Sequence, residues 1–276
     1  MLAESMSVLP GGKGANQAVA AARLGGDVAL VGAIGDGPFS ETAISGLRDT
    51  GVGLDAVSTV HGHSGVALVT VSDDGENSIV VVPGANHSVD ADLVGRHAGL
   101  VAGAAVVVLQ AEIPVSGIEA AARTATGRVL LNLAPVVPLG TDVLALADPL
   151  VVNAGEAWRL LHDAGRPIPE DSPFAVVDAL LDLGPRSVVL TMGAAGAVVC
   201  EPAHDGGTPV VVPAPHVRVE DTTGAGDAFI GAMAWRLAEG DTIADAARTA
   251  VRAGAYSVTT AGAQPSFPNA QDVLPR

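Results

Sequence analysis

The sequence is poor in cysteine and in aromatic residues. Its single cysteine, Cys200, excludes an internal disulfide and any cysteine-based metal cluster, and it suits a reducing cytoplasm. Aromatic residues make up only 3% of the chain, whereas hydrophobic residues make up 49%, which favours small-residue helices packed closely on a Val-rich sheet. There is no apolar run long enough to span a bilayer and no basic-plus-apolar signal at Met1. We therefore expect a cytoplasmic protein with no membrane partner.

Basic residues are also scarce. The net charge of −16 argues against nucleic acid and anionic membrane surfaces as partners. Of the 14 basic residues 13 are Arg, and the one lysine, Lys13, lies inside a cluster of glycines. This placement hints that Lys13 has a specific role.

The most informative stretch is Asp221-Thr222-Thr223-Gly224-Ala225-Gly226-Asp227-Ala228-Phe229, a glycine-rich turn followed by an apolar helical pattern. Backbone N–H groups of Gly224, Ala225 and Gly226 at such a helix start form an anion-binding site. A carboxylate there would repel an anion, but Asp227 is suitably placed to take a proton from a hydroxyl that attacks a phosphoryl group. From this stretch alone, an ordinary helix-capping Asp explains the residue equally well.

A second glycine-rich segment, Pro10–Gln17, runs into an Ala-rich helix that continues to Leu24. Its glycines allow a ligand to approach the backbone, and Lys13 and Asn16 offer donors suited to sugar hydroxyls. It is not a Walker A loop, because the spacing differs and no Ser or Thr follows the lysine. A plain glycine-rich linker remains the alternative, although it would not need both polar residues.

Strands and helices alternate along most of the chain, which predicts an α/β fold whose mostly parallel central sheet is flanked by helices on both faces. A strand at 28–34 and a helix at 39–49 come first. Strands at 66–71 and 78–82 around the turn 73–76 then predict a β-hairpin in a small sheet of its own. Further on we predict helices at 91–100, 117–124, 156–162, 175–183, 225–239 and 243–258, and strands at 105–110, 129–133, 150–152, 187–192, 196–200 and 209–212.

Four regions follow from this pattern. Residues 1–10 are predicted to contribute a partial lid strand, 11–59 an α/β core, 60–86 the β-hairpin lid, and 87–276 an α/β core with the nucleotide site.

Polar residues recur at the carboxyl ends of the predicted strands, where open α/β sheets bind ligands. They are Gln110-Ala111-Glu112, Asn132, Asn153–Glu156 and the turn Thr191–Gly196. Glu156 has the chemistry to arrange a hydrated Mg²⁺, and it suits a helix N-terminus equally well. The turn with Gly193 and Gly196 either lies against a nucleotide or is an ordinary hairpin turn.

Together these motifs resemble the signatures of the PfkB family of carbohydrate kinases. Gly11–Ala18 is similar to the first family signature in the form typical of ribokinases, and Asp221–Phe229 is similar to the second, which carries the catalytic base. Asn153…Glu156 resembles the family's Asn-x-x-Glu motif for Mg²⁺ and phosphate, and Gly262–Ser266 is also ribokinase-like. The resemblance runs from about residue 2 to the C-terminus, and two long signatures in the right order are specific.

The resemblance implies a ribokinase-like fold and ATP-dependent phosphorylation of a pentose at its primary hydroxyl, with D-ribose giving ribose 5-phosphate. Asp227 would be the base, and Gly224, Ala225 and Gly226 the anion hole. Residues implied to hold the sugar are Gly12, Lys13, Gly14, Asn16, Glu112 and Asp227. Those implied to hold ATP are Asn153, Thr191, Gly193, Gly196 and Gly226. Glu156 would hold Mg²⁺, and K⁺ would be held by Asp221, Thr223, Ser257, Thr260, Gly262 and Ser266, several through backbone carbonyls. Asp221 is the more persuasive ligand, because a carboxylate beside a phosphate site needs a cation to offset it.

The sequence departs from the family pattern in two places. Val251 stands where the family often has a polar residue near the adenine, so we expect that contact to be apolar or absent. Pro10–Lys13 lies much closer to Met1 than in ribokinases, whose preceding residues include the first core strand and an Asp that grips the sugar. We therefore expect a mis-set start codon or a truncated reading frame, with Leu2–Leu9 as a remaining lid strand and with impaired activity for a chain that truly starts at Met1.

Three functions stay open at this point. The first is a ribokinase-type enzyme, which the Gly-Gly-Lys-Gly-Ala-Asn-Gln form favours. The second is a PfkB kinase for another sugar or a nucleoside. The third is a shortened, inactive homologue with a binding or regulatory role, against which the intact Asp227 and Glu156 argue. The family also implies a homodimer that packs through the lid, and the apolar face expected of the hairpin is consistent with it.

Overall fold

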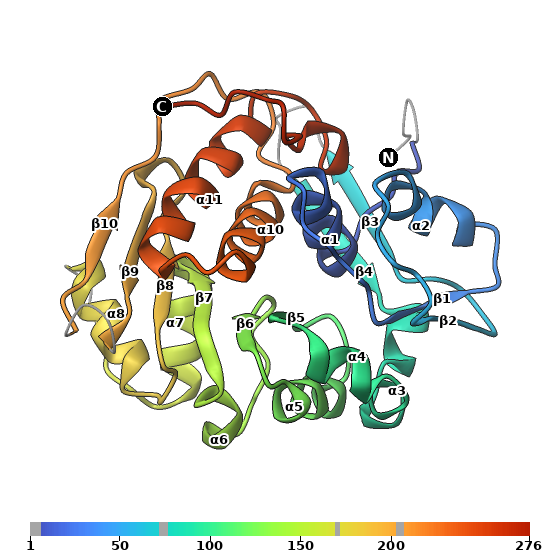
Figure 1. Ribbon diagram of the computed structural model, residues 1–276, viewed down its shortest axis with the longest axis horizontal. Coiled ribbons are helices and arrows are strands. Elements are labelled where there is room, and N and C mark those ends of the chain that lie inside the picture. Colours follow the sequence, from blue (N-terminus) through green and yellow to red (C-terminus); the bar gives the residue numbers. More distant parts are fainter. Residues whose placement is uncertain (1–6, 72–76, 169–171, 203–206) are drawn as a thin grey trace.

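The main sheet of the protein has six strands in the order β10–β9–β8–β7–β6–β5. In the computed structural model, which describes residues 7–71, 77–168, 172–202 and 207–276, four of them are parallel (Figure 1). They are β5 (Val106–Gln110), β6 (Arg128–Asn132), β7 (Ala147–Asn153) and β8 (Val188–Thr191). The strands β9 (Ala197–Cys200) and β10 (Val210–Val212) each pair antiparallel with the strand before them in sequence. The predicted mostly parallel α/β sheet is confirmed.

Helices cover both faces of this sheet, which explains why the middle of its central strands carries apolar residues on both faces. On one face Leu131, Leu150 and Leu190 belong to a core with residues of α5 (Val115–Thr124), α7 (Ala154–Asp163) and α8 (Pro173–Leu181). Their neighbours in sequence, such as Leu130 and Val151, face the other core, formed with α10 (Ala225–Ala238) and α11 (Ile243–Ser257).

Two small sheets complete the described strands. The short strands β1 (Gly32–Gly35) and β2 (Val57–Val60) pair in parallel, and β3 (Val66–Val71) and β4 (Asn77–Val82) form the predicted antiparallel hairpin. The remaining helices are α1 (Lys13–Arg23), α2 (Ser40–Asp49), α3 (Ala91–Arg96), α4 (Ala98–Gly103), α6 (Thr141–Leu144) and the 3₁₀ helices η1 (Gly84–Ser88), η2 (Gly193–Ala195) and η3 (Gln264–Ser266). None of the helices in the described ranges has the length and apolar character needed to cross a membrane.

Two local predictions need correction, and short elements were missed. The strand predicted at 28–34 is shorter, because only residues 32–35 join a ladder while Ala29 makes an isolated bridge to Gly53. The helix predicted at 91–100 breaks at His97, between Gly95 and Gly99, where glycine weakens the helix. The strand β2 and the short helix α6 were not predicted. The predicted lid strand at 2–9 and the turn at 73–76 fall largely or wholly outside the described residues, and residues 7–9 are not in a strand.

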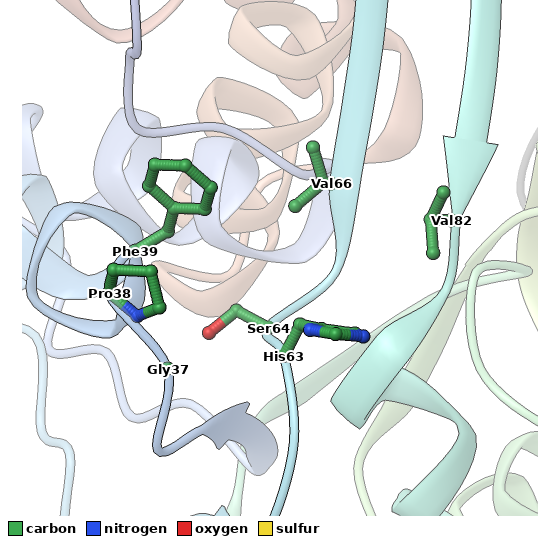
Figure 2. Close-up of a pocket in the computed structure, with 7 residues that line it drawn as sticks. All are labelled: Gly37, Pro38, Phe39, His63, Ser64, Val66 and Val82. Carbon is green, nitrogen blue, oxygen red and sulfur yellow. The ribbon is translucent and has the colours of Figure 1, made fainter.

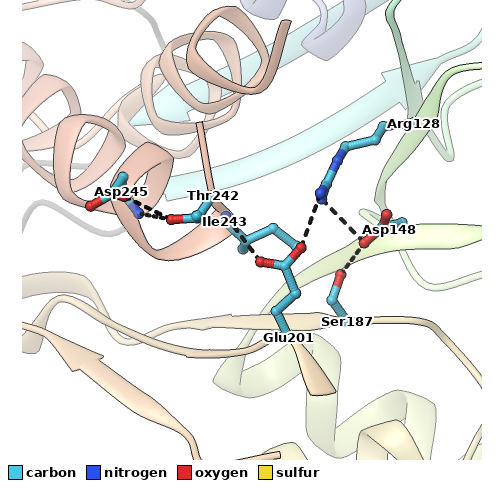
Figure 3. A network of polar contacts seen from close by, with 7 residues as sticks. All are labelled: Arg128, Asp148, Ser187, Glu201, Thr242, Ile243 and Asp245. Atoms are coloured by element: carbon cyan, nitrogen blue, oxygen red, sulfur yellow. Dashed lines mark hydrogen bonds and ion pairs between the residues drawn. The ribbon is translucent and has the colours of Figure 1, made fainter. Parts of the chain in front are cut away.

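Ion pairs at the amino ends of the parallel strands hold α11 in place (Figure 3). The Arg128 guanidinium pairs with Asp148 at 3.3 Å and with Glu201 at 3.0 Å, while Ser187 donates to Asp148. The other carboxylate oxygen of Glu201 accepts the N–H of Ile243, the first residue of α11, at 3.3 Å. Since this network lies at the ends of the strands opposite to the polar residues predicted to bind ligands, it serves the fold.

The helices α1 and α10 approach each other closely, and this contact positions the candidate site. A Cβ on Gly231 of α10 would lie 2.5 Å from the Cβ of Ala20 and 2.6 Å from the carbonyl oxygen of Gln17. Only glycine permits that approach, which brings the first turns of the two helices together.

Candidate active site

A cavity of about 150 Å³ lies at the carboxyl ends of β6, β7 and β8, beside the start of α10. Its lining includes eight residues that the sequence singled out, namely Lys13, Asn132, Asn153, Glu156, Thr191, Gly224, Gly226 and Asp227. The other lining residues are Ala134, Val151, Val152, Phe229 and Ile230. Residues far apart in the sequence therefore meet at the edge of the sheet where α/β proteins bind ligands.

The start of α10 is a sharp turn that requires glycine. Gly224 has a φ of 77°, and a Cβ there would lie 2.8 Å from the Cβ of Ala263. Of the predicted anion-hole amides, the Ala225 N–H donates to the Thr222 carbonyl at 3.2 Å. The N–H groups of Gly226 and Asp227 make no hydrogen bond within the described chain, and neither does that of Gly224. These three N–H groups therefore remain for a bound anion.

Asp227 is buried, with 8% of its surface exposed. Its Oδ2 accepts a hydrogen bond from Asn16 Nδ2 at 2.8 Å, and its Oδ1 accepts one from Gln17 Nε2 at 2.9 Å. Both donors belong to α1, and no side chain caps the N-terminus of α10. The capping interpretation of Asp227 is therefore wrong.

Burial raises the pKa of the Asp227 carboxyl, and the hydrogen bonds from Asn16 and Gln17 together with the charge of Lys13 oppose that rise. A raised pKa makes the carboxylate a stronger base, while the donors keep it ionised and oriented. That combination suits a group that accepts a proton near neutral pH.

The first turn of α1 brings the predicted sugar-binding residues to the same place. Lys13 N–H donates to Glu112 Oε2 at 3.0 Å, and Asn16 reaches Asp227. The pKa of Glu112 is raised, mainly by burial and also by the charge of Asp227. The backbone N–H and the charge of Lys13 oppose that rise. Gly12, the N-cap of α1, has a φ of 90°, and a Cβ on Gly14 in the first turn would lie 3.2 Å from Gln110 Oε1.

Gln17, which is 3% exposed and central to the site, was not among the predicted site residues. Its Nε2 donates to Asn132 Oδ1 at 3.1 Å as well as to Asp227, and its Oε1 accepts from Gln110 Nε2 at 2.6 Å. The available signal was its spacing, because Gln17 lies four residues after Lys13 and so on the same face of the helix.

Asn153 and Glu156 form a capping box at the start of α7. Asn153 Oδ1 accepts the Glu156 N–H at 2.9 Å, and Glu156 Oε2 accepts the Asn153 N–H at 2.8 Å. Burial raises the pKa of Glu156, while the Asn153 N–H and the charge of Lys13 oppose that rise. The helix-terminus interpretation of Glu156 is confirmed, and Oε1 stays without a hydrogen bond in the described part of the chain.

Three of the predicted K⁺ ligands lie together. Asp221 Oδ1 accepts from the N–H and the hydroxyl of Thr223, at 2.8 and 2.6 Å, and Oδ2 accepts from the Gly262 N–H at 2.8 Å. These hydrogen bonds, the Thr223 hydroxyl first, lower the pKa of Asp221. They offset part of its charge without a cation. The hydroxyls of Ser257 and Ser266 donate to the carbonyls of Gly254 and Ala263, and Thr260 follows Ser257 in the same turn.

The turn between β8 and β9 has an ordinary hairpin geometry. Met192 N–H donates to the Gly196 carbonyl at 2.8 Å, and a Cβ on Gly196 would lie 2.0 Å from the Val212 carbonyl of β10. Packing therefore accounts for Gly196. Thr191 lines the cavity, whereas Gly193 and Gly196 do not. Val251 is buried in the core of α10 and α11 and does not line it either.

A second cavity, of about 180 Å³, lies between the start of α2 and the hairpin. Figure 2 shows Phe39 and Pro38 on one side of it and Val66 and Val82 on the other. Its lining is mostly apolar, contains no carboxylate and lies at the base of the hairpin.

Comparison with known proteins matches nearly the whole length of the chain. The family described as pfkB family carbohydrate kinase matches residues 1–270. The ribokinase of Schizosaccharomyces pombe is 36% identical over 95% of this chain and 85% of its own length. The ribokinase of Bacillus subtilis is 35% identical over 99% and 89%, and the deoxyribokinase of Salmonella typhimurium is 34% identical over 94% and 84%.

The structural matches agree with these. The ribokinase of Arabidopsis thaliana, solved in complex with ribose and ATP, aligns with a TM-score of 0.89 at 31% identity, over 98% of this chain and 88% of that one. The ribokinase of Thermotoga maritima also has a TM-score of 0.89, at 30% identity and the same coverage.

Proposed function

This chain belongs to the pfkB family of carbohydrate kinases, and we propose that it transfers the γ-phosphoryl group of ATP to the primary hydroxyl of D-ribose, giving ribose 5-phosphate. One observation carries the proposal. The buried carboxylate of Asp227 lies beside the two first-turn N–H groups of α10 that are left for an anion, in a cavity that also contains Lys13.

The chemistry follows from this arrangement. Asp227 accepts the proton of the sugar hydroxyl, whose oxygen forms a bond to the γ-phosphorus as the bond to the bridging oxygen of ADP breaks. The electron pair of the broken bond leaves with ADP. The N–H groups of Gly226 and Asp227 and the charge of Lys13 stabilise the negative charge on the phosphoryl oxygens.

The ligand contacts are proposed from the positions of the residues. Gly12, Lys13, Gly14, Asn16 and Glu112 hold the sugar, and Asn153, Thr191, Gly193, Gly196 and Gly226 hold ATP. For ATP, Asn153, Thr191 and Gly226 have direct support because they line the cavity. The backbone of the turn at Gly193 and Gly196 contacts the nucleotide from outside the cavity.

Two cations are proposed to bind. Mg²⁺ would neutralise phosphate charge, and Glu156 would hold it through Oε1. Phosphates and waters would supply the other ligands, since no group of three His, Cys, Asp or Glu side chains that could hold a metal occurs in the described residues. Asp221, Thr223, Ser257, Thr260, Gly262 and Ser266 would hold K⁺. Both donor sets are oxygen-rich, as these ions require.

The hairpin is proposed to act as a lid and to pair with the lid of a second copy. Leu68 and Val80 lie opposite each other in the ladder and are 56% and 60% exposed. Val69, Val81 and Val82 are exposed as well. A two-stranded sheet with this much exposed apolar surface gains stability from a partner. We place the enzyme in the cytoplasm, where the buried Cys200 would stay reduced.

A coupled assay of ADP release tests the proposed function. D-Ribose, deoxyribose, a ketohexose and a nucleoside are each supplied with ATP, Mg²⁺ and K⁺, and D-ribose should give the highest kcat/KM. Deoxyribose is the specific competitor, since a deoxyribokinase is among the relatives. Asp227→Asn should lower kcat by about 10³-fold or more and leave ATP binding in place. A chain that phosphorylates no sugar would instead support the inactive, binding homologue.

A further inference from the structure

Two chains of side-chain amides end on Asp227. In one, Gln110 Nε2 donates to Gln17 Oε1 at 2.6 Å, and Gln17 Nε2 donates to Asp227 Oδ1 at 2.9 Å. In the other, Gln264 Nε2 donates to Asn16 Oδ1 at 3.0 Å, and Asn16 Nδ2 donates to Asp227 Oδ2 at 2.8 Å. Each oxygen of the carboxylate therefore receives a hydrogen bond from an amide that is itself held by a second amide.

The direction of the hydrogen bonds is fixed by the carboxylate. An ionised carboxylate only accepts, so Asn16 must turn Nδ2 toward Asp227 and Oδ1 away from it. That oxygen needs a donor, and Gln264 supplies it. Without this donor, only the attraction to Asp227 would hold the Asn16 amide in the orientation that the base requires.

Gln264 occupies this position at a cost to stability. It is 3% exposed, and its Oε1 is a buried side-chain atom with no hydrogen-bond partner among the described residues. A buried acceptor without a partner destabilises the folded state, and a methionine would fill the same space without that penalty. Packing alone therefore does not account for a glutamine here.

The neighbouring helix leaves room for the Gln264 amide. A Cβ on Gly46 of α2 would lie 1.9 Å from Gln264 Oε1, so any larger residue at 46 would displace the amide. On the other side, Gln264 is in η3, between Gly262, whose N–H contacts Asp221, and Ser266. The same short segment thus contacts both Asp221 and, through Asn16, Asp227.

We infer that Gln264 is a positioning residue for phosphoryl transfer, which acts through Asn16 to orient the Asp227 carboxylate. This inference rests on the proposed function. The charged groups that face Asp227 are Lys13 and Glu112, with Glu156 on the same cavity. None of them contacts Gln264 by a described hydrogen bond, so its effect on the base passes through the amide of Asn16.

The test is a double-mutant cycle in kcat with Gln264→Met and Asn16→Ala. Gln264→Met keeps the volume and removes the donor, and it should lower kcat by about fivefold to tenfold with a smaller change in KM for ATP. In the Asn16→Ala background the same substitution should change kcat by less than about twofold, because the residue it acts through is gone. Equal effects in both backgrounds would overturn the inference.

A reversed donor provides a second readout. Gln264→Glu has the same size but offers only acceptors when ionised, so Asn16 would turn Nδ2 toward the new carboxylate and Oδ1 toward Asp227. Asp227 then loses a donor, and the acid limb of kcat/KM should move to higher pH by about one unit. An unshifted limb would contradict the inference. Gln271→Glu makes the same chemical change at an exposed position near the C-terminus, and it should leave both kcat and the acid limb unchanged.

Controls separate the possible failures. Circular dichroism and thermal unfolding show whether the Gln264 variants fold. If they do not, Gly46→Ala displaces the same amide and should also lower kcat, whereas Gly95→Ala, at an exposed helical glycine with open space, should not. If the unsubstituted chain phosphorylates no sugar, the proposed function fails. If it is active and Gln264→Met matches it in kcat, only the present inference fails.

Discussion

Gly231 of α10 lies directly against Ala20 of α1, and a Cβ on Gly231 would come within 2.5 Å of the Cβ of Ala20. This close approach sets the spacing between the two helices that meet at the candidate site. On one side of it is Asp227, and on the other are its two hydrogen-bond donors, Asn16 and Gln17.

The first prediction concerns this contact. Gly231→Ala should lower the free energy of unfolding by about 1–3 kcal/mol, because the added methyl group forces the helices apart. It should also lower kcat, since α10 carries Asp227 away from its donors. Chemical denaturation and the ribose assay measure the two effects. Gly99→Ala in α4, where nothing lies within 4 Å of the added Cβ, is the control and should leave both nearly unchanged or slightly stabilise the protein. Unchanged activity in a destabilised Gly231→Ala protein would show that the spacing matters only for the fold.

Much of this site could be predicted from the sequence because its residues are contiguous in two motifs. The turn at Gly224 and the carboxylate of Asp227 were read from one stretch, and Lys13 and Asn16 from another. Gln264 and Gly231 could not be assigned roles in the same way. Their partners, Asn16 and Ala20, lie more than two hundred residues away, and the contact pattern exists only after α1 and α10 have packed.

Other differences between the predicted and the observed structure have local causes. The strand β2 includes Ser58 and Thr59 and has only four residues, too few for a clear alternation. For Glu156 the sequence allowed either a helix terminus or a Mg²⁺ ligand. The structure confirms the first role and leaves Oε1 for the second, since one carboxylate has two oxygens.

The second prediction is a pH dependence that follows from the raised pKa of Asp227. The acid limb of the kcat/KM profile should titrate above about 3.9, the ordinary value for Asp, because the base must be ionised. An acid limb at or below the ordinary value would contradict the assigned base or its burial.

Stability should change with pH in the opposite sense to activity. Since the pKa of Asp227 is higher in the folded than in the unfolded chain, the folded chain binds more protons between the two values. Its contribution to stability is complete below the unfolded pKa and is lost as the pH rises through the folded pKa. The difference in free energy of unfolding between Asp227→Asn and the unsubstituted chain should therefore grow with pH in that window. A constant difference would count against a raised pKa.

The third prediction concerns Asp221. Replacing Na⁺ by K⁺ at constant ionic strength should raise the rate of ribose phosphorylation, and Asp221→Asn should reduce that stimulation at least several-fold, because the substitution removes the negative charge beside the proposed cation. Asp49→Asn, at an exposed position in α2, is the matched control and should keep the full response to K⁺. If the Asp221→Asn protein responds to K⁺ like the control, the proposed cation site is elsewhere.

The fourth prediction tests the lid. Leu68 and Val80 form a directly opposed apolar pair on the hairpin, and both are more than half exposed. If two hairpins pack against each other, Leu68→Asp would bury a charge at their contact, which costs far more than it does on a free surface. Light scattering should then give twice the chain mass for the unsubstituted protein and the single chain mass for the variant. Val211→Asp is the matched control, because Val211 is also an apolar strand residue, 49% exposed, but lies in β10 of the main sheet. If the Val211→Asp protein dissociates while the Leu68→Asp protein stays dimeric, the interface lies on β10. An unsubstituted chain that is monomeric at micromolar concentration would argue against any lid-to-lid contact.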